Sequence, residues 1–167
     1  MTDRPSFDPD AFTHPLREQF DVFIDEQRVA MEASLEGLTD EQARRHLVTS
    51  RTTLLGLVKH ATFVERVWFG EAIGRRSRAE LGIAAGPDES FELSPDDTIE
   101  SVLAAYRAAC VQSRLAAAPL DLDDVVTGNR RGPLPLRWVL LHMLRELAQH
   151  CGHADIIREQ LLATPPA

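Results

Sequence analysis

A glutamate and a histidine lie four residues apart near the C-terminus, as Glu146 and His150, in a long stretch rich in apolar residues. On a helix this spacing puts both side chains on one face, about one turn apart. A carboxylate oxygen and an imidazole nitrogen could then reach the same cation. His60, in another apolar stretch with helical spacing, is the best candidate for a third ligand. These residue types and their spacing indicate a divalent metal site.

The helical angles of Glu146 and His150 predict that both side chains point toward the core. At about 100° per residue, His150 falls at the edge of the apolar stripe and Glu146 lies about 40° further round. A buried carboxylate is costly unless it is paired or bound to a metal. Two other interpretations stay open. His60 could be a hydrogen-bonded core histidine, and Glu146 could form a surface ion pair with Arg145 or Arg137.

The other histidines fall into two groups. His142 and His153 point away from the centre of the stripe, where either could orient a metal ligand through a hydrogen bond. A direct contact of His142 with the metal would instead close the site and favour a structural role. His14 and His46 lie in predicted loops and receive no role.

The cysteines and the loop arginines suggest further chemistry. Cys151 adjoins His150, but sequence neighbours point about 100° apart on a helix, so we interpret Cys151 as a packed thiol rather than a nucleophile. Two groups of arginines could bind an anion at the mouth of a helical bundle, or could be solvated loop charge. These groups are Arg75, Arg76 and Arg78, and Arg130 and Arg131.

Four stretches with the spacing of amphipathic helices must position these residues. The expected helices cover residues 16–36, 52–73, 95–118 and 136–162. The first contains one polar interruption, Gln27, and is followed by a capping box formed by Thr39 and Gln42. Irregular connections over 74–94 and 121–135 separate the later helices, and no segment alternates as a β-strand does.

This organisation predicts an all-α protein, a four-helix bundle with a long crossover between the second and third helices. Ser94 is expected to cap the third helix, with Pro95 at its first position. The 167 residues are expected to form one domain, 1–167, with a loose polar arm over 1–14 and a short tail over 163–167.

Composition narrows the class of protein. A formal net charge of -8 argues against a nucleic-acid partner, because phosphate contacts need a clustered positive face. The chain shows no apolar signal core and no run long enough to span a bilayer, so we expect a cytoplasmic protein without a membrane partner. Two loosely spaced cysteines, Cys110 and Cys151, are expected to be free thiols in a reducing compartment.

Two sequence blocks resemble the DinB-like superfamily, and more narrowly its branch close to the mycothiol-dependent maleylpyruvate isomerases. The blocks comprise residues 53–60 with 64–69, and residues 136–146 with 150–159. The resemblance implies a four-helix bundle with a long crossover, a homodimer, and a divalent metal that is commonly zinc or nickel. It assigns His60, Glu146 and His150 as ligands. Many members have histidine at the position of Glu146, and the carboxylate matches the isomerase-like variant.

Two histidines and one carboxylate leave a coordination position open on zinc, as in catalytic sites. With the resemblance, this predicts an enzyme that activates a low-molecular-weight thiol, with mycothiol as the candidate, and directs it at a small electrophile for transfer or isomerisation. The alternatives are a hydrolase that uses a metal hydroxide, a non-heme iron oxygenase, and a metal-stabilised, stress-associated bundle without catalytic activity.

Overall fold

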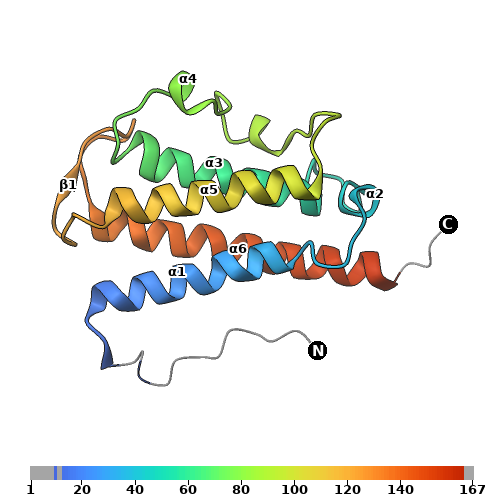
Figure 1. Cartoon of the computed structure of the whole chain (residues 1–167), viewed down its shortest axis with the longest axis horizontal. Helices are drawn as coiled ribbons and strands as arrows, with labels where there is room; N and C mark the ends of the chain where they lie inside the picture. The colour runs from blue at the N-terminus through green and yellow to red at the C-terminus, as the bar shows by residue number, and fades with distance from the viewer. Residues whose placement is uncertain (1–9, 11–12, 164–167) are drawn as a thin grey trace.

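The computed structural model describes residue 10 and residues 13–163 of the chain. Four long helical segments lie side by side along the long axis of the molecule (Figure 1). They are α1 (Leu16–Ala33), α3 (Leu54–Glu65) with its π-helical continuation η2 (Arg66–Glu71), α5 (Ile99–Ala117) and α6 (Leu136–Ala163). Helix α6 packs against α1 and α3, and α3 packs against α5. The prediction of a mostly helical protein is confirmed.

Short elements connect the long helices. They are the helices α2 (Asp40–Ala43) and α4 (Arg78–Leu81), the 3₁₀ helix η3 (Glu89–Phe91), and the strands β1 (Val125–Val126) and β2 (Leu134–Pro135). The capping box predicted at Thr39 and Gln42 starts α2. The two strands pair antiparallel, so the expectation of a chain without strands is wrong. Two residues per strand are too few to produce an alternating pattern in the sequence.

The ends of the helices differ from the predicted bounds. The arm over residues 1–14 and the tail over 163–167 fall mainly outside the described residues, although Ala163 still belongs to α6. Helix α1 ends at Ala33, three residues before its predicted end. The single helix predicted over 52–73 is α-helical only to Glu65 and continues as a π-helix.

Helix α5 starts later than predicted because the preceding turn folds back onto α3. Thr98, not Ser94, accepts the backbone N–H of Ser101 and caps the helix. The side chain of Asp97 accepts hydrogen bonds from the backbone N–H of Ser94 and from Lys59 Nζ, each at 2.7 Å. These bonds tie the turn to α3 before the helix begins.

The charged residue on the buried face of α1 is Arg28. Gln27, which the sequence placed on the apolar face, is only half-buried, whereas Arg28 is 5% exposed. Arg28 donates two hydrogen bonds of 2.8 Å to the carboxylate of Glu65, at the end of α3. A bidentate pair of this kind joins α1 to the last residue of α3, directly before the π-helix begins.

The crossover between α3 and α5 approaches α3 closely at Gly56. A Cβ atom at this position would lie 2.9 Å from the carbonyl oxygen of Phe91, a distance that real Cβ atoms do not adopt. Glycine therefore allows η3 to lie directly on the helix. As a result Ser90 and Phe91 come into contact with His60, one turn further along α3.

The core lies between the long helical segments and consists mainly of aliphatic side chains from α1, α3, α5 and α6. Helix α6 is the longest of the described helices, and its buried positions alternate with charged and polar ones. Within the described residues, no helix combines the length and the apolar character that a membrane span requires.

Candidate metal centre

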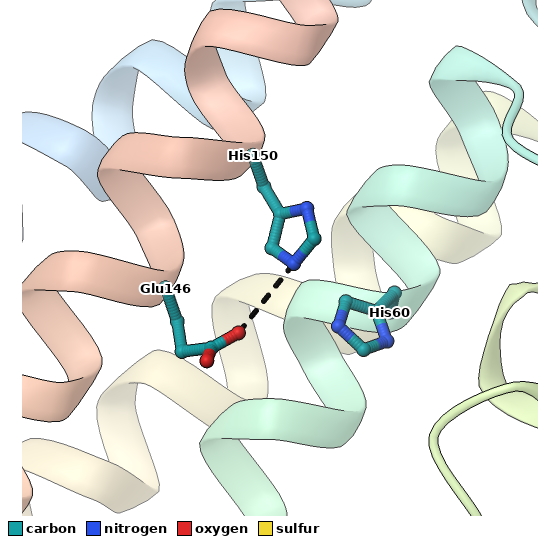
Figure 2. Close-up of side chains that lie close together, drawn as sticks. All are labelled: His60, Glu146 and His150. Atoms are coloured by element: carbon teal, nitrogen blue, oxygen red, sulfur yellow. Dashed lines mark ion pairs between the residues drawn. The ribbon is translucent and has the colours of Figure 1, made fainter.

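Helices α3 and α6 bring His60, Glu146 and His150 together, and we call these residues the triad (Figure 2). One nitrogen or oxygen atom of each lies within 4.8 Å of the others. His150 Nε2 is 3.6 Å from Glu146 Oε2. Two ligands of one tetrahedral zinc ion lie about 3.3 to 3.6 Å apart. The donor types and the spacing of the pair on α6 therefore fit a divalent metal, and the assignment of the triad as ligands stays a prediction.

His60 is held by a serine that the sequence analysis missed. Its Nδ1 is 2.6 Å from the hydroxyl oxygen of Ser90, and this hydroxyl donates its only proton to the carbonyl oxygen of Pro87. The Ser90 oxygen must therefore accept a hydrogen bond from His60 Nδ1–H. This fixes the tautomer of His60 and leaves the lone pair of Nε2 as the atom that can bind a metal.

Burial keeps the imidazole of His60 neutral, which is the protonation state that can bind a metal. The imidazole stacks on the ring of Phe91, with centroids 4.0 Å apart, and its edge meets His150 at 4.8 Å. Burial, the largest cause, and the positive charge of His150 together lower the pKa of His60 to about 4, although Glu146 opposes the shift. His60 is therefore neutral at neutral pH.

Glu146 is ionised and has cationic or hydrogen-bonding neighbours on its own helix. The contact with His150 contributes most to lowering the pKa of Glu146 to about 2, with burial acting against it and His142 and Arg145 adding to it. At 3.6 Å the contact with His150 is longer than a normal hydrogen bond, so we regard it as a close electrostatic contact. A carboxylate that stays ionised is ready to bind a cation.

The structure places His142 beside the triad as a neighbour of Glu146. Arg145 Nη2 donates to His142 Nδ1 at 2.8 Å, and arginine has no lone pair to accept with. The proton of a neutral His142 is therefore on Nε2, which lies 3.5 Å from Glu146 Oε1. Burial is the main cause of the lowered pKa of His142, so the neutral ring is favoured. In this form His142 can orient Glu146 but offers no free nitrogen to a metal.

The sequence suggested that His153 could orient a metal ligand through a hydrogen bond, and the structure does not show such a bond to His150. The His153 ring lies 5.8 Å from that of His150, but His153 is exposed. His150 Nδ1 is buried and has no hydrogen-bond partner among the described residues, so His153 does not orient it by a hydrogen bond.

A cavity of about 340 Å³ lies beside the triad, and His60 and Glu146 form part of its wall. His142 and Trp68 also line it, together with three of the arginines that the sequence analysis named, Arg78, Arg130 and Arg131. Arg75 and Arg76 are not part of this wall. The volume lies at the lower end of the range for small-molecule sites.

Neither cysteine is suited to act as a nucleophile. Cys151 is buried with its Sγ 3.4 Å from the carbonyl oxygen of Gln27, and burial raises its pKa to about 11. Cys110 lies against the Arg28–Glu65 ion pair, and burial raises its pKa to about 12. Both thiols are protonated at neutral pH, in agreement with the interpretation of Cys151 as a packed thiol.

The fold is similar to that of two solved structures. One is the crystal structure of a DinB-like protein from Bacillus cereus ATCC 10987, at 17% sequence identity and a TM-score of 0.64, covering 90% of this chain and 95% of that one. The other is the crystal structure of a conserved protein from Enterococcus faecalis, at 13% identity and a TM-score of 0.71, covering 90% of this chain and 99% of that one. The fold is thus of the DinB-like class.

The sequence model of the Mycothiol-S-transferase family matches residues 19–163, and the chain belongs to this family. Membership of the DinB-like superfamily, predicted from the two sequence blocks, is confirmed. No curated protein matches the chain.

Proposed function

We propose that the protein is a metal-dependent mycothiol S-transferase of the DinB-like, four-helix-bundle type. His60, Glu146 and His150 would hold a divalent metal, zinc first and nickel second. When bound, this metal would lower the pKa of a coordinated thiol and so favour the thiolate. The observation that carries the proposal is the convergence of two imidazoles and one carboxylate beside a cavity that His60 and Glu146 line, in a chain of this family.

Residues of the chain prepare the site for this chemistry. Ser90 keeps the Nε2 lone pair of His60 available, and His142 supports the ionised Glu146. Phe63 and Trp68 line the cavity and Phe91 stacks on His60, so apolar rings lie beside the triad. Both cysteines are buried and protonated, so the nucleophilic thiol must come from a cosubstrate.

The proposed reaction also implies particular partners and a cellular compartment. Mycothiol and a small electrophile are the partners, with no role for nucleic acid or a membrane. A thiol-dependent reaction and two free cysteines suit a reducing compartment, so we expect the cytoplasm. A homodimer stays a prediction. The cavity beside the triad favours a catalytic site over a metal that only stabilises the fold.

The first experiment is the metal content of untagged protein purified without added metal, measured by mass spectrometry. We expect about one equivalent in the wild type and its loss in His150→Ala. His46→Ala is the matched control, because His46 is an exposed histidine on a connecting segment and outside the triad. A wild type that folds but binds neither zinc nor nickel on reconstitution would contradict the metal site.

The second experiment measures mycothiol consumption with a chromogenic aryl halide, before and after removal of the metal with a chelator. Turnover should disappear with the metal and return with zinc or nickel, and it should be absent in His150→Ala. Turnover that survives complete metal removal would refute the proposal. Ester hydrolysis without any thiol would identify the alternative hydrolase.

A further inference from the structure

The cavity beside the triad contains more positive charge than its own side chains neutralise. Arg78 and Arg130 share one carboxylate, since Arg78 Nε is 2.9 Å from Glu71 Oε2 and Arg130 Nε is 3.5 Å from Glu71 Oε1. For Arg131, which also lines the cavity, no carboxylate lies within ion-pair distance in the described part of the chain. Three guanidinium groups thus face Glu71 and the triad carboxylate, and a bound divalent metal would add further positive charge.

Arg131 is an exposed residue whose guanidinium lies against two indoles, and none of its side-chain N–H groups has a hydrogen-bond partner among the described residues. Its guanidinium carbon is 6.0 Å from the ring centre of Trp68 and 5.9 Å from that of Trp138. Aromatic faces attract a cation through their quadrupole, but they do not accept all five N–H groups of an arginine. The guanidinium therefore keeps a planar set of donors that matches the two oxygens of an oxyanion.

A second donor at the same cavity is also without an acceptor. Asn129 Oδ1 accepts the backbone N–H of Arg131, and because that nitrogen can only donate, the amide orientation of Asn129 is determined. Its Nδ2 is then the free donor. This Nδ2 is buried and has no partner among the residues that the structure describes. Buried donors in native proteins are almost always paired, so an acceptor from outside the chain, a ligand oxygen or an ordered water, is expected here.

The loop that carries both donors is fixed to the end of η2. The backbone N–H of Gly128 donates to the carbonyl oxygen of Ala72 at 3.0 Å. A Cβ at Gly128 would lie 2.1 Å from the carbonyl oxygen of Glu71, so only glycine allows this approach. The position of Arg131 and Asn129 beside the cavity is therefore set by backbone contacts.

We propose that Arg131 and Asn129 bind an oxyanionic group, a carboxylate first, on the small electrophile that this protein uses. The binding site itself follows from the unpaired donors, and only the identification of its ligand with the electrophile rests on the proposed function. Phe63, Val64 and Val67 also line the cavity, and their apolar side chains suit the carbon skeleton of such a molecule. The preferred substrates are thus anionic electrophiles, and neutral ones would bind more weakly.

The test uses benzoate and its neutral analogue benzamide as probes of metal-free protein. Trp68 and Trp138 are the only tryptophans of the chain, and both contact Arg131, so intrinsic fluorescence reports binding at this place. Calorimetry gives the same affinity independently of the tryptophans. We expect saturable binding of benzoate, about tenfold or more tighter than that of benzamide.

Two variants and one control separate this site from general charge effects. Arg131→Gln and Asn129→Asp should each weaken benzoate binding about tenfold or more, since the second replaces the free donor by an acceptor. Arg76→Gln removes the same charge outside the cavity and should leave binding within about twofold of the wild type. Thermal unfolding checks that each variant is folded.

Equal affinity for benzoate and benzamide, unchanged binding by Arg131→Gln, or no saturable benzoate binding by the wild type would each overturn the proposal. Inorganic phosphate that competes and binds more tightly than benzoate would support the oxyanion site and assign it to phosphate rather than carboxylate. Because the titration needs no metal, its outcome is independent of the metal analysis: a protein that fails to bind zinc could still show this site, and the reverse also holds.

Discussion

Replacement of Ser90 by alanine should weaken zinc binding by the triad about tenfold to a hundredfold without unfolding the protein. In the wild type the Ser90 oxygen accepts His60 Nδ1–H at 2.6 Å. Without this acceptor, metal-free His60 can move its proton to Nε2 and avoid an unpaired buried donor. With zinc on Nε2 it cannot, so the bound state alone carries a penalty of about 1–3 kcal/mol. This penalty corresponds to a loss in affinity of roughly 5- to 150-fold.

The assay is a competition for zinc between the protein and a chromophoric chelator at neutral pH, with thermal unfolding of the metal-free forms alongside. Ser113→Ala is the matched control, because Ser113 is a buried serine, 2% exposed, that lines cavities without any triad residue. Ser90→Thr keeps the hydroxyl and should retain most of the affinity. Zinc binding by Ser90→Ala within twofold of the wild type would show that Ser90 does not determine the tautomer of His60.

Three further predictions concern stability and reactivity. Arg28→Met should destabilise the protein by about 3–5 kcal/mol in urea unfolding, because Glu65 then stays buried without its partner; a loss below about 1 kcal/mol would contradict this. Iodoacetamide should modify Cys110 and Cys151 at pH 8 only after unfolding, since their pKa values are about 12 and 11; rapid labelling of folded protein, seen by mass spectrometry, would be inconsistent. The pKa of His60 is about 4 in the folded protein and near 6.5 in the unfolded chain. The folded state therefore keeps its full stability above pH 6.5 and loses stability as the pH falls from 6.5 through 4, because only the unfolded chain binds the proton readily in this range. Metal-free wild type should thus lose up to about 3 kcal/mol over this range, and His60→Phe should lose less; parallel pH profiles of the two proteins would refute this.

The part of the site that could be predicted from the sequence depends on local periodicity. Glu146 and His150 are related by one helical turn, and a regular helix needs no tertiary information to place them on one face. His60 required one further assumption, that two apolar helices pack with their stripes together, and the structure brings the three side chains within reach. The arginines were named as two groups, but which of them line a cavity depends on loop positions.

The residues that the sequence did not indicate act through contacts distant along the chain. Ser90 lies in an irregular crossover, and it reaches His60 only because Gly56 lets η3 approach the helix. Arg28 pairs with a residue 37 positions away, so neither helix alone indicates that it is buried. Single-chain periodicity contains no signal for contacts of this kind.

The π-helix η2 divides the second long helical segment into two halves with different surroundings. His60 belongs to the regular half, whereas Trp68 and Glu71, which line the cavity with the arginines, follow the change in helix type at Arg66. One residue deleted from a regular α-helix rotates the side chains beyond the deletion by about 100°. A π-helical turn contains about one residue more than an α-helical turn, so deleting one residue within Arg66–Glu71 would restore α-helix and leave the side chains beyond it facing nearly as before. This turn can therefore gain or lose a single residue while His60 before it and the residues after it keep their directions. A change of length confined to this turn would thus alter the residues beside the cavity, Trp68 and Glu71 among them, without disturbing the triad.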